Sequence, residues 1–221
     1  MSESTSSWQV AGIELVNGVH VIETYATTTL LVDDRLVLID TSADAQPAKI
    51  LDYLAKVKVS PRDLSTIFIT HTHPDHVGGL GAIKADSPAK VAAHRIEADF
   101  VSRRRPYDGP PGVQRHTPTP VDVLLEDGQT YDGLRVVFAP GHTRGSIALL
   151  DETRSLLIAG DSANNESGLR PMDDRYNIDP KQHRESIKKV AKLHFEHAVF
   201  GHGVPIKSGA SQRFEELAKR L

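Results

Sequence analysis

Histidine and aspartate side chains crowd one short stretch of the chain, and together they could bind metal ions. His71, His73, Asp75 and His76 place four candidate ligands within six positions. Three imidazoles and a carboxylate this close together would be costly to bury without partners, because buried polar and charged groups need compensation. A divalent cation removes that cost, since it takes neutral imidazole and ionised carboxylate as ligands. The segment therefore predicts a metal site.

Three further candidate ligands follow later apolar runs of the sequence. Each comes after a short strand-like segment and adjoins a glycine: His142 after Val136–Ala139, Asp161 after Leu156–Ala159, and His202 after Ala198–Phe200. A glycine lets the backbone approach a ligand closely. Five histidines and two aspartates are too many ligands for one tetrahedral zinc ion, but they suit two ions that share a carboxylate.

The elements that must position these side chains alternate between β-branched apolar runs and helical patterns, which predicts a layered α/β fold. The apolar run Thr66–Thr70 leads directly into the first four ligands, so a rigid strand end would aim them. Further strands are expected at Val19–Glu23, Thr28–Val32, Leu36–Ile39 and Lys90–Ala93. Helices are expected at Pro47–Val57, from Arg95 to about Ser102, from Pro180 onwards with Asp179 as its cap, and at Ser211–Leu221. On the helix that starts at Pro180, we expect Ile187, Val190, Ala191 and His194 to share one apolar face.

Two segments are too rich in proline or turn residues to form regular elements, namely Arg103–Pro120 and Gly168–Pro180. Long loops of this kind often border binding sites. Candidate pocket residues in them are Tyr107, Met172 and Tyr176. The run Arg103–Arg105 is expected to be a solvated charged surface. The other histidines lack a ligand-like context and are expected to play ordinary structural roles: His20, His94, His116, His183, His194 and His197.

Length and composition narrow the class of protein. The 221 residues suit a single domain spanning 1–221. The chain has no cysteine, which excludes disulfides and thiolate metal sites. Its 26 basic and 29 acidic residues give a net charge of −3, so neither nucleic acid nor an anionic membrane is an expected partner. The polar first residues carry no signal peptide pattern, and no apolar run would span a bilayer. We expect a cytoplasmic protein with a small-molecule substrate, and we leave a homodimer open.

The run His71-Thr72-His73-Pro74-Asp75-His76, with the later His142, Asp161 and His202, resembles the metallo-β-lactamase superfamily. Its glyoxalase II-like and lactonase-like members are the most similar. The resemblance extends from the strand-like run Leu36–Asp40 to Gly203. It implies an αββα sandwich, in which two mixed sheets are flanked by helices and the metals lie at one edge of the sheets.

The resemblance also implies roles for individual residues. One metal ion would take His71, His73 and His142, and the other would take Asp75, His76 and His202. Asp161 would bridge the two ions. Asp75 would also orient the nucleophile and so act in catalysis, and Asp40 would support the ligands from behind. Two divalent ions are expected, with zinc as the first choice and iron or manganese as alternatives.

The activity implied is that of a dinuclear metal-dependent hydrolase. It would cleave an ester, thioester or lactone through a metal-bridging hydroxide, with promiscuity toward phosphoesters or β-lactams as an extension. Many lactonases of the family carry a tyrosine where this chain has Asn164, and Tyr176 is a candidate to take its place in space. The alternative is an oxidoreductase similar to the persulfide dioxygenases, with a single iron on His71, His142 and Asp161.

Overall fold

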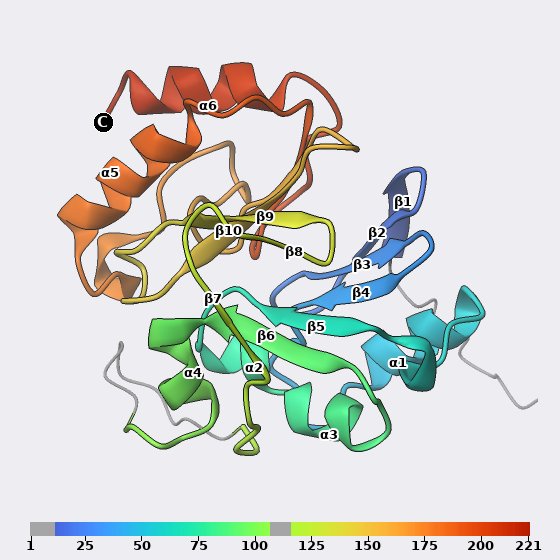
Figure 1. The fold of residues 1–221 in the computed structure, drawn as a ribbon. Coiled ribbons are helices and arrows are strands. Elements are labelled where there is room, and N and C mark those ends of the chain that lie inside the picture. The colour runs from blue at the N-terminus through green and yellow to red at the C-terminus, as the bar shows by residue number, and fades with distance from the viewer. Residues whose placement is uncertain (1–11, 107–115) are drawn as a thin grey trace, which may run out of the picture.

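Two β-sheets pack face to face in the computed structural model, and helices cover the outer surface of each sheet (Figure 1). The structure describes residues 12–106 and 116–221. The first sheet contains, in spatial order, β1 (Gly12–Val16), β2 (Val19–Ile22), β3 (Thr28–Val32), β4 (Leu36–Ile39), β5 (Thr66–Ile69), β6 (Lys90–His94) and β7 (Val123–Leu125). The second contains β12 (His197–Val199), β11 (Leu156–Ile158), β10 (Ile147–Asp151), β9 (Leu134–Phe138) and β8 (Thr130–Tyr131). Both sheets mix parallel and antiparallel pairs, as expected for the αββα sandwich.

The helices divide between the two outer surfaces. Those of the first half are α1 (Ala48–Lys56), α2 (Pro74–Val77), α3 (Leu80–Ala85) and α4 (Arg95–Val101), and those of the second are α5 (Pro180–Val190) and α6 (Ala210–Ala218). Single 3₁₀ turns occupy Pro61–Asp63 and Asp174–Tyr176. None of the helices in the described ranges has the length and apolar character needed to cross a membrane.

Three apolar layers stabilise the sandwich, and the side chains of β5 pack into two of them. Ile67 and Ile69 face the helices of the first half, whereas Phe68 between them points into the layer between the sheets. Successive side chains of a strand alternate between its faces, so a strand covered on both sides must be apolar throughout. All four residues of β5 are buried accordingly. Burial on both faces fixes the position and register of β5. It therefore also fixes where the ligands that follow the strand begin.

The strands that precede the candidate ligands end at the same edge of the molecule. β4 and β5 are parallel neighbours in the first sheet. In the second sheet β11 and β12 are parallel, and β9 runs in the same direction because each of β9 and β11 is antiparallel to β10. Backbone hydrogen bonds join the two sheets at this edge, from Ile147 to Thr70 (3.1 Å) and from Thr27 to Gly201 (2.7 Å). The loops of both sheets therefore meet there.

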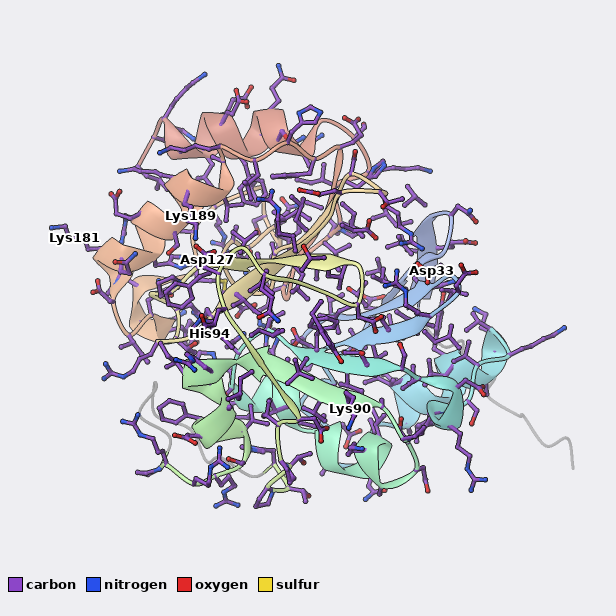
Figure 2. All side chains as sticks on the ribbon, in the orientation of Figure 1. Asp33, Lys90, His94, Asp127, Lys181 and Lys189 are labelled. Atoms are coloured by element: carbon purple, nitrogen blue, oxygen red, sulfur yellow. The ribbon has the colours of Figure 1, made fainter. Side chains whose placement is uncertain are left out.

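An ion pair joins helix α5 to the loop that follows β7 (Figure 2). Nζ of Lys189 lies 2.8 Å from both carboxylate oxygens of Asp127, which follows β7, and donates to the carbonyl oxygen of Phe138 at 2.9 Å. Asp127 in turn accepts the backbone N–H of Phe138 at 2.8 Å. The contact is exposed and adds little, so the buried side chains of Ile187 and Val190 are what hold the helix on the sheet.

Most predicted elements are present, within one or two residues of the expected bounds. Four strands were not predicted: β1, β7, β8 and β10. The first three are short or lie at sheet edges. β10 is buried along its whole length, and a short apolar run buried on all sides has no periodicity that separates strand from helix.

The prediction for His194 was wrong. Helix α5 ends at Val190 and Ala191 is its C-cap. The chain then turns, with the backbone N–H of Leu193 bonded to the carbonyl of Val190 at 3.0 Å. The helical face therefore does not reach His194, whose side chain is exposed, and Phe195 fills the buried position instead.

Candidate metal centre

All seven predicted ligands meet at the shared edge of the two sheets, in two clusters. The first cluster contains His71, His73, His142 and Asp161, and the second contains Asp75, His76 and His202. Within each cluster the potential ligand atoms lie within 4.8 Å of one another. Each cluster draws on both sheets, because the residues numbered 71–76 follow β5 and the other three follow β9, β11 and β12. That these side chains bind metal stays a prediction, whereas their convergence is a feature of the structure.

The local fold explains how six residues can serve two clusters. A one-turn helix, α2, begins at Pro74, where proline lacks an N–H that the first turn would leave unbonded. His73 has extended backbone, and His71, two positions before it, contributes to the same cluster. Asp75 and His76 lie on the helical turn and contribute to the other cluster. The sequence pattern placed these ligands at a strand end but did not predict the turn of helix.

Asp161 lies between the two clusters. Its Oδ2 is 3.1 Å from Nε2 of His142, 3.9 Å from Nε2 of His71 and 3.5 Å from Nε2 of His202. Its Oδ1 is 3.4 Å from Nε2 of His76. One carboxylate thus faces histidines of both clusters, which is the geometry expected of a bridging ligand.

These side chains fit a pair of divalent ions. Nε2 of His71, His76 and His142 and Oδ1 of Asp161 are buried and make no hydrogen bond with any described residue. Buried polar atoms are rarely left this way unless something else completes their coordination. Imidazole nitrogens and carboxylate oxygens form the donor set that zinc accepts, and that iron and manganese also accept. The donors and their unmet bonding capacity therefore suit metal ions.

The protonation states of His71, His73, Asp75 and Asp161 also suit cations. Burial, together with the neighbouring histidines, holds the pKa of His71 well below its ordinary value, and the same causes lower the pKa of His73 to about 3. Burial opposes ionisation of Asp161 and Asp75, but the adjacent histidines outweigh it and lower the pKa of both carboxyl groups. Neutral imidazoles beside ionised carboxylates are the forms that bind metal.

His76 has the opposite tendency, which Asp40 explains. Burial disfavours its charged form, yet the carboxylates of Asp40 and Asp161 outweigh burial and raise the pKa of His76 well above the ordinary value. Nδ1 of His76 lies 2.7 Å from Oδ2 of Asp40. Asp40 also accepts from the backbone N–H of Thr70 at 2.8 Å and from its hydroxyl at 2.7 Å. Asp40 therefore orients His76 from behind, as the family resemblance implied, and Thr70 is a partner that the sequence did not reveal.

A second supporting residue, Asn177, was also missed. Its Oδ1 accepts from Nδ1 of His142 at 2.9 Å, and its Nδ2 donates to the carbonyl of Met172 at 3.3 Å. Metal-binding histidines commonly use their second ring nitrogen in this way. Asn177 lies 35 positions from His142 in the chain, so no local motif could reveal the pair.

The clusters form the floor of an open cleft of about 550 Å³. Met172 and Tyr176 line it, as predicted. Tyr107 lies outside the described residues, and the described part of Arg103–Pro120 contributes nothing to the cleft. Tyr25, in the loop between β2 and β3, was not predicted. It lines the cleft with 78% of its surface exposed, and its ring meets the ring of His202 edge-on at 6.3 Å.

The remaining histidines belong to neither cluster. His94 is the last residue of β6, and its ring stacks on Phe138 at 4.4 Å. His183 is fully buried near His142 and accepts the backbone N–H of Met172 at 3.2 Å. A second cavity of about 580 Å³ lies away from the clusters, and its charged residues pair with one another, as Arg154 does with Asp33 and Asp151. The cleft above the clusters is therefore the candidate site.

Comparison with known proteins gives the chain a family context. Residues 22–202 match the model of the family described as the Metallo-beta-lactamase superfamily. The "Probable metallo-hydrolase YflN" of Bacillus subtilis is 27% identical, over 98% of this chain and 96% of that protein. A hydroxyacylglutathione hydrolase of Bdellovibrio bacteriovorus is 29% identical over 74% of this chain, which spans 57% of that protein. The uncharacterised protein YobT of Bacillus subtilis is 31% identical over 62% of this chain and 61% of its own length.

Solved structures show the same fold. A metallo-beta-lactamase family protein from Thermus thermophilus superposes with a TM-score of 0.73 at 26% identity, over 94% of this chain and 80% of that one. The class B3 di-zinc metallo-beta-lactamase LRA-12 from an Alaskan soil metagenome gives a TM-score of 0.76 at 21% identity, over 100% of this chain and 96% of that one. The second likeness concerns the fold alone.

Proposed function

The chain belongs to the metallo-beta-lactamase superfamily, and from this membership we propose that it is a hydrolase that uses two divalent metal ions to cleave an ester, a thioester or a lactone. One observation carries the proposal: seven histidine and aspartate side chains converge in two clusters with Asp161 between them, on the floor of an open cleft. Names of relatives that contain "metallo-hydrolase" and "hydroxyacylglutathione hydrolase" support the reaction class.

The residues divide between the two ions by cluster. His71, His73 and His142 would hold one ion, Asp75, His76 and His202 would hold the other, and Asp161 would contact both. Zinc is the metal we propose, because five of the seven ligands are imidazoles, which suit zinc better than ions such as manganese that prefer oxygen donors. Bound there, two divalent ions supply electrostatic stabilisation of developing negative charge and lower the pKa of a nearby water.

Asp75 is the residue we propose to orient the attacking water. It lines the cleft, and its Oδ2 lies 3.1 Å from Nε2 of His202. Burial favours its neutral form, but the bond to His202 and the charge of His76 outweigh burial and lower the pKa of Asp75. An ionised carboxylate facing the cleft accepts a hydrogen bond from water and fixes the direction of its lone pair.

The walls of the cleft favour a small substrate with both polar and apolar parts. Tyr25, Met172 and Tyr176 offer apolar surface, and Arg170 and Arg175 offer hydrogen-bond donors. Asn164 offers little to a substrate, because its Oδ1 accepts the backbone N–H of Glu166 at 2.8 Å and its Nδ2 donates to the same residue at 3.2 Å. Tyr176, which lines the cleft, is the residue that we propose to contact a leaving group.

The test begins with metal content. Protein purified without added metal is analysed for zinc, iron and manganese, and then assayed against lactones, thioesters, aryl esters and phosphoesters. We expect two ions per chain and turnover of at least one carbonyl substrate that disappears on chelation and returns with zinc. The variant Asp75→Asn should lower kcat about 100-fold or more. Asp173→Asn, which changes another carboxylate of the cleft outside both clusters, should leave kcat within about threefold.

Two results would reject this function. Activity that persists after complete metal removal would exclude metal-dependent hydrolysis. One iron per chain, with oxygen consumed when a persulfide is supplied and no hydrolysis of the panel, would indicate a dioxygenase in place of a hydrolase.

A further inference from the structure

Glu97 is a carboxylate that the proposed chemistry does not use, although it is only 1% exposed. It lies in the first turn of α4. Its Oε2 accepts the backbone N–H of Thr72 at 2.8 Å and also the hydroxyl of Thr72. Its Oε1 accepts the hydroxyl of Thr143 at 2.6 Å and the backbone N–H of Gly145 at 2.9 Å. All four donors come from two loops, one on each side of the carboxylate.

These two loops carry the three histidines of the first cluster. Thr72 stands between His71 and His73 in the loop that follows β5 of the first sheet. Thr143 comes directly after His142 in the loop that follows β9 of the second sheet. One carboxylate oxygen is therefore bonded to each ligand loop, and the side chain spans the junction between the sheets.

The loop after β9 is shaped to admit this side chain. A methyl group on Gly145 would lie 2.8 Å from Cγ and 3.0 Å from Oε1 of Glu97, which is closer than packing allows. The hydroxyl of Thr143 also lies 2.7 Å from Oγ of Ser146, and the backbone N–H of Thr143 donates to the same oxygen at 3.0 Å. The loop is thus held in one conformation by Glu97 and by its own bonds.

We propose that Glu97 is a positioning residue for the first metal ion, one that sets the distance between His142 and the pair His71 and His73. This role rests on the proposed function, because it presumes that these histidines bind metal. The physical reason is that three ligands on two separate loops hold an ion tightly only if the loops cannot drift apart. A carboxylate with an oxygen for each loop provides that constraint, and a neutral amide cannot accept from both sides.

The test is zinc binding by the whole chain, measured by competition with a chromophoric chelator after EDTA treatment. In Glu97→Gln one oxygen becomes an NH₂ group, so one loop loses its acceptor. We expect one of the two zinc sites to weaken about 10- to 100-fold while the other keeps its affinity. Thr143→Val removes one donor from the same network with little change of volume, and should weaken the same site to a smaller degree. It also provides a second reading if Glu97→Gln folds poorly.

Asp151→Asn is the matched control. Asp151 is another buried carboxylate, 3% exposed, and it pairs with Arg154 at 2.7 Å beside the second cavity, away from the clusters. It should cost stability yet leave both zinc affinities unchanged. Wild type that binds two zinc ions, with folded Glu97→Gln and Thr143→Val variants that bind them equally well, would overturn the positioning role alone. Wild type that binds no zinc would overturn the proposed function and this role with it.

Discussion

A methyl group on Gly201 would lie 2.0 Å from Oδ1 of Asp161 and 2.8 Å from Cε1 of His76. Because Gly201 has no side chain, the carboxylate of Asp161 can lie close to its backbone. Among the residues around the clusters, this one shows that the site depends on a missing side chain as much as on the ligands themselves.

We predict that Gly201→Ala keeps the fold and loses metal. Asp161 is buried and cannot turn away without leaving the histidines of both clusters. Zinc affinity should fall about 100-fold or more, as expected when a ligand is displaced. Gly128→Ala is the control: no described residue lies within 4 Å of its added methyl, but its φ of +76° makes a side chain cost about 1 kcal/mol. Equal zinc affinity in Gly201→Ala and wild type would contradict the prediction.

Single residues also show what sequence reasoning could reach. The candidate ligands were recognisable because four of them lie within six positions and each of the others follows an apolar run. Glu97 and Asn177 were not recognisable, because their partners lie 25 to 48 positions away in the chain. Nothing in the local sequence separates a buried glutamate in a helix from a solvated one. Only the packing of two sheets brings such pairs together.

At the scale of elements, the loops that follow the strands determine what can enter the cleft. Tyr25 comes from the loop between β2 and β3, whereas Tyr176 comes from the 3₁₀ turn that precedes α5. The two side chains are 78% and 45% exposed, and both line the cleft. Both loops therefore present aromatic surface to whatever binds above the metals.

We predict that Tyr25→Ala raises KM for substrates with a bulky apolar or aryl group about tenfold, as expected for the loss of a partly buried aromatic contact. The kcat should stay within about threefold, because no reacting group is removed. The ratio of KM values for an aryl ester and for a short acyl ester, measured in both proteins, checks this. Leu124→Ala is the control, since Leu124 is 49% exposed and does not line the cleft. An equal change for both substrates would argue against an aromatic subsite.

Elements were predicted best where burial leaves a periodic signal. α1 was expected almost at its observed bounds, because its apolar residues recur at helical spacing. β5 has no period, but its β-branched run leads directly into the candidate ligands, and it was expected within one residue of its observed end. β10 was missed although it is central, since Ile-Ala-Leu-Leu carries no period. The end of α5 was placed too late because apolar residues continue at helical spacing past the turn at Leu193.

At the scale of the whole molecule, a buried histidine links stability to pH. His183 is fully buried, its Nε2 accepts from the backbone N–H of Met172, and its Nδ1 has no hydrogen-bond partner among the described residues. Burial and the nearby His142 lower the pKa of His183 to about 4. The unfolded chain, with an ordinary pKa near 6.5, therefore binds more protons between pH 6.5 and 4, and the contribution to stability present above pH 6.5 is lost as the pH falls.

We predict that His183→Gln makes the stability of the metal-free protein less sensitive to acid. Because of this histidine, the free energy of unfolding of the wild type should be about 2 kcal/mol lower at pH 5 than at pH 8. The variant should not show this loss. Urea unfolding at the two pH values gives the comparison. His194→Gln, whose side chain is exposed, should follow wild type. Parallel stability curves for His183→Gln and wild type would mean that the buried ring is not the source of acid sensitivity.

Each candidate metal cluster takes ligands from both sheets, and this has a consequence for how the molecule comes together. The part of the chain up to β7 holds His71, His73, Asp75 and His76, and the part from β8 onwards holds His142, Asp161 and His202. Neither part contains a complete ligand set. Metal would therefore bind tightly only after the two halves have packed against each other. Once bound, an ion would slow the separation of the halves and so lower the rate of unfolding.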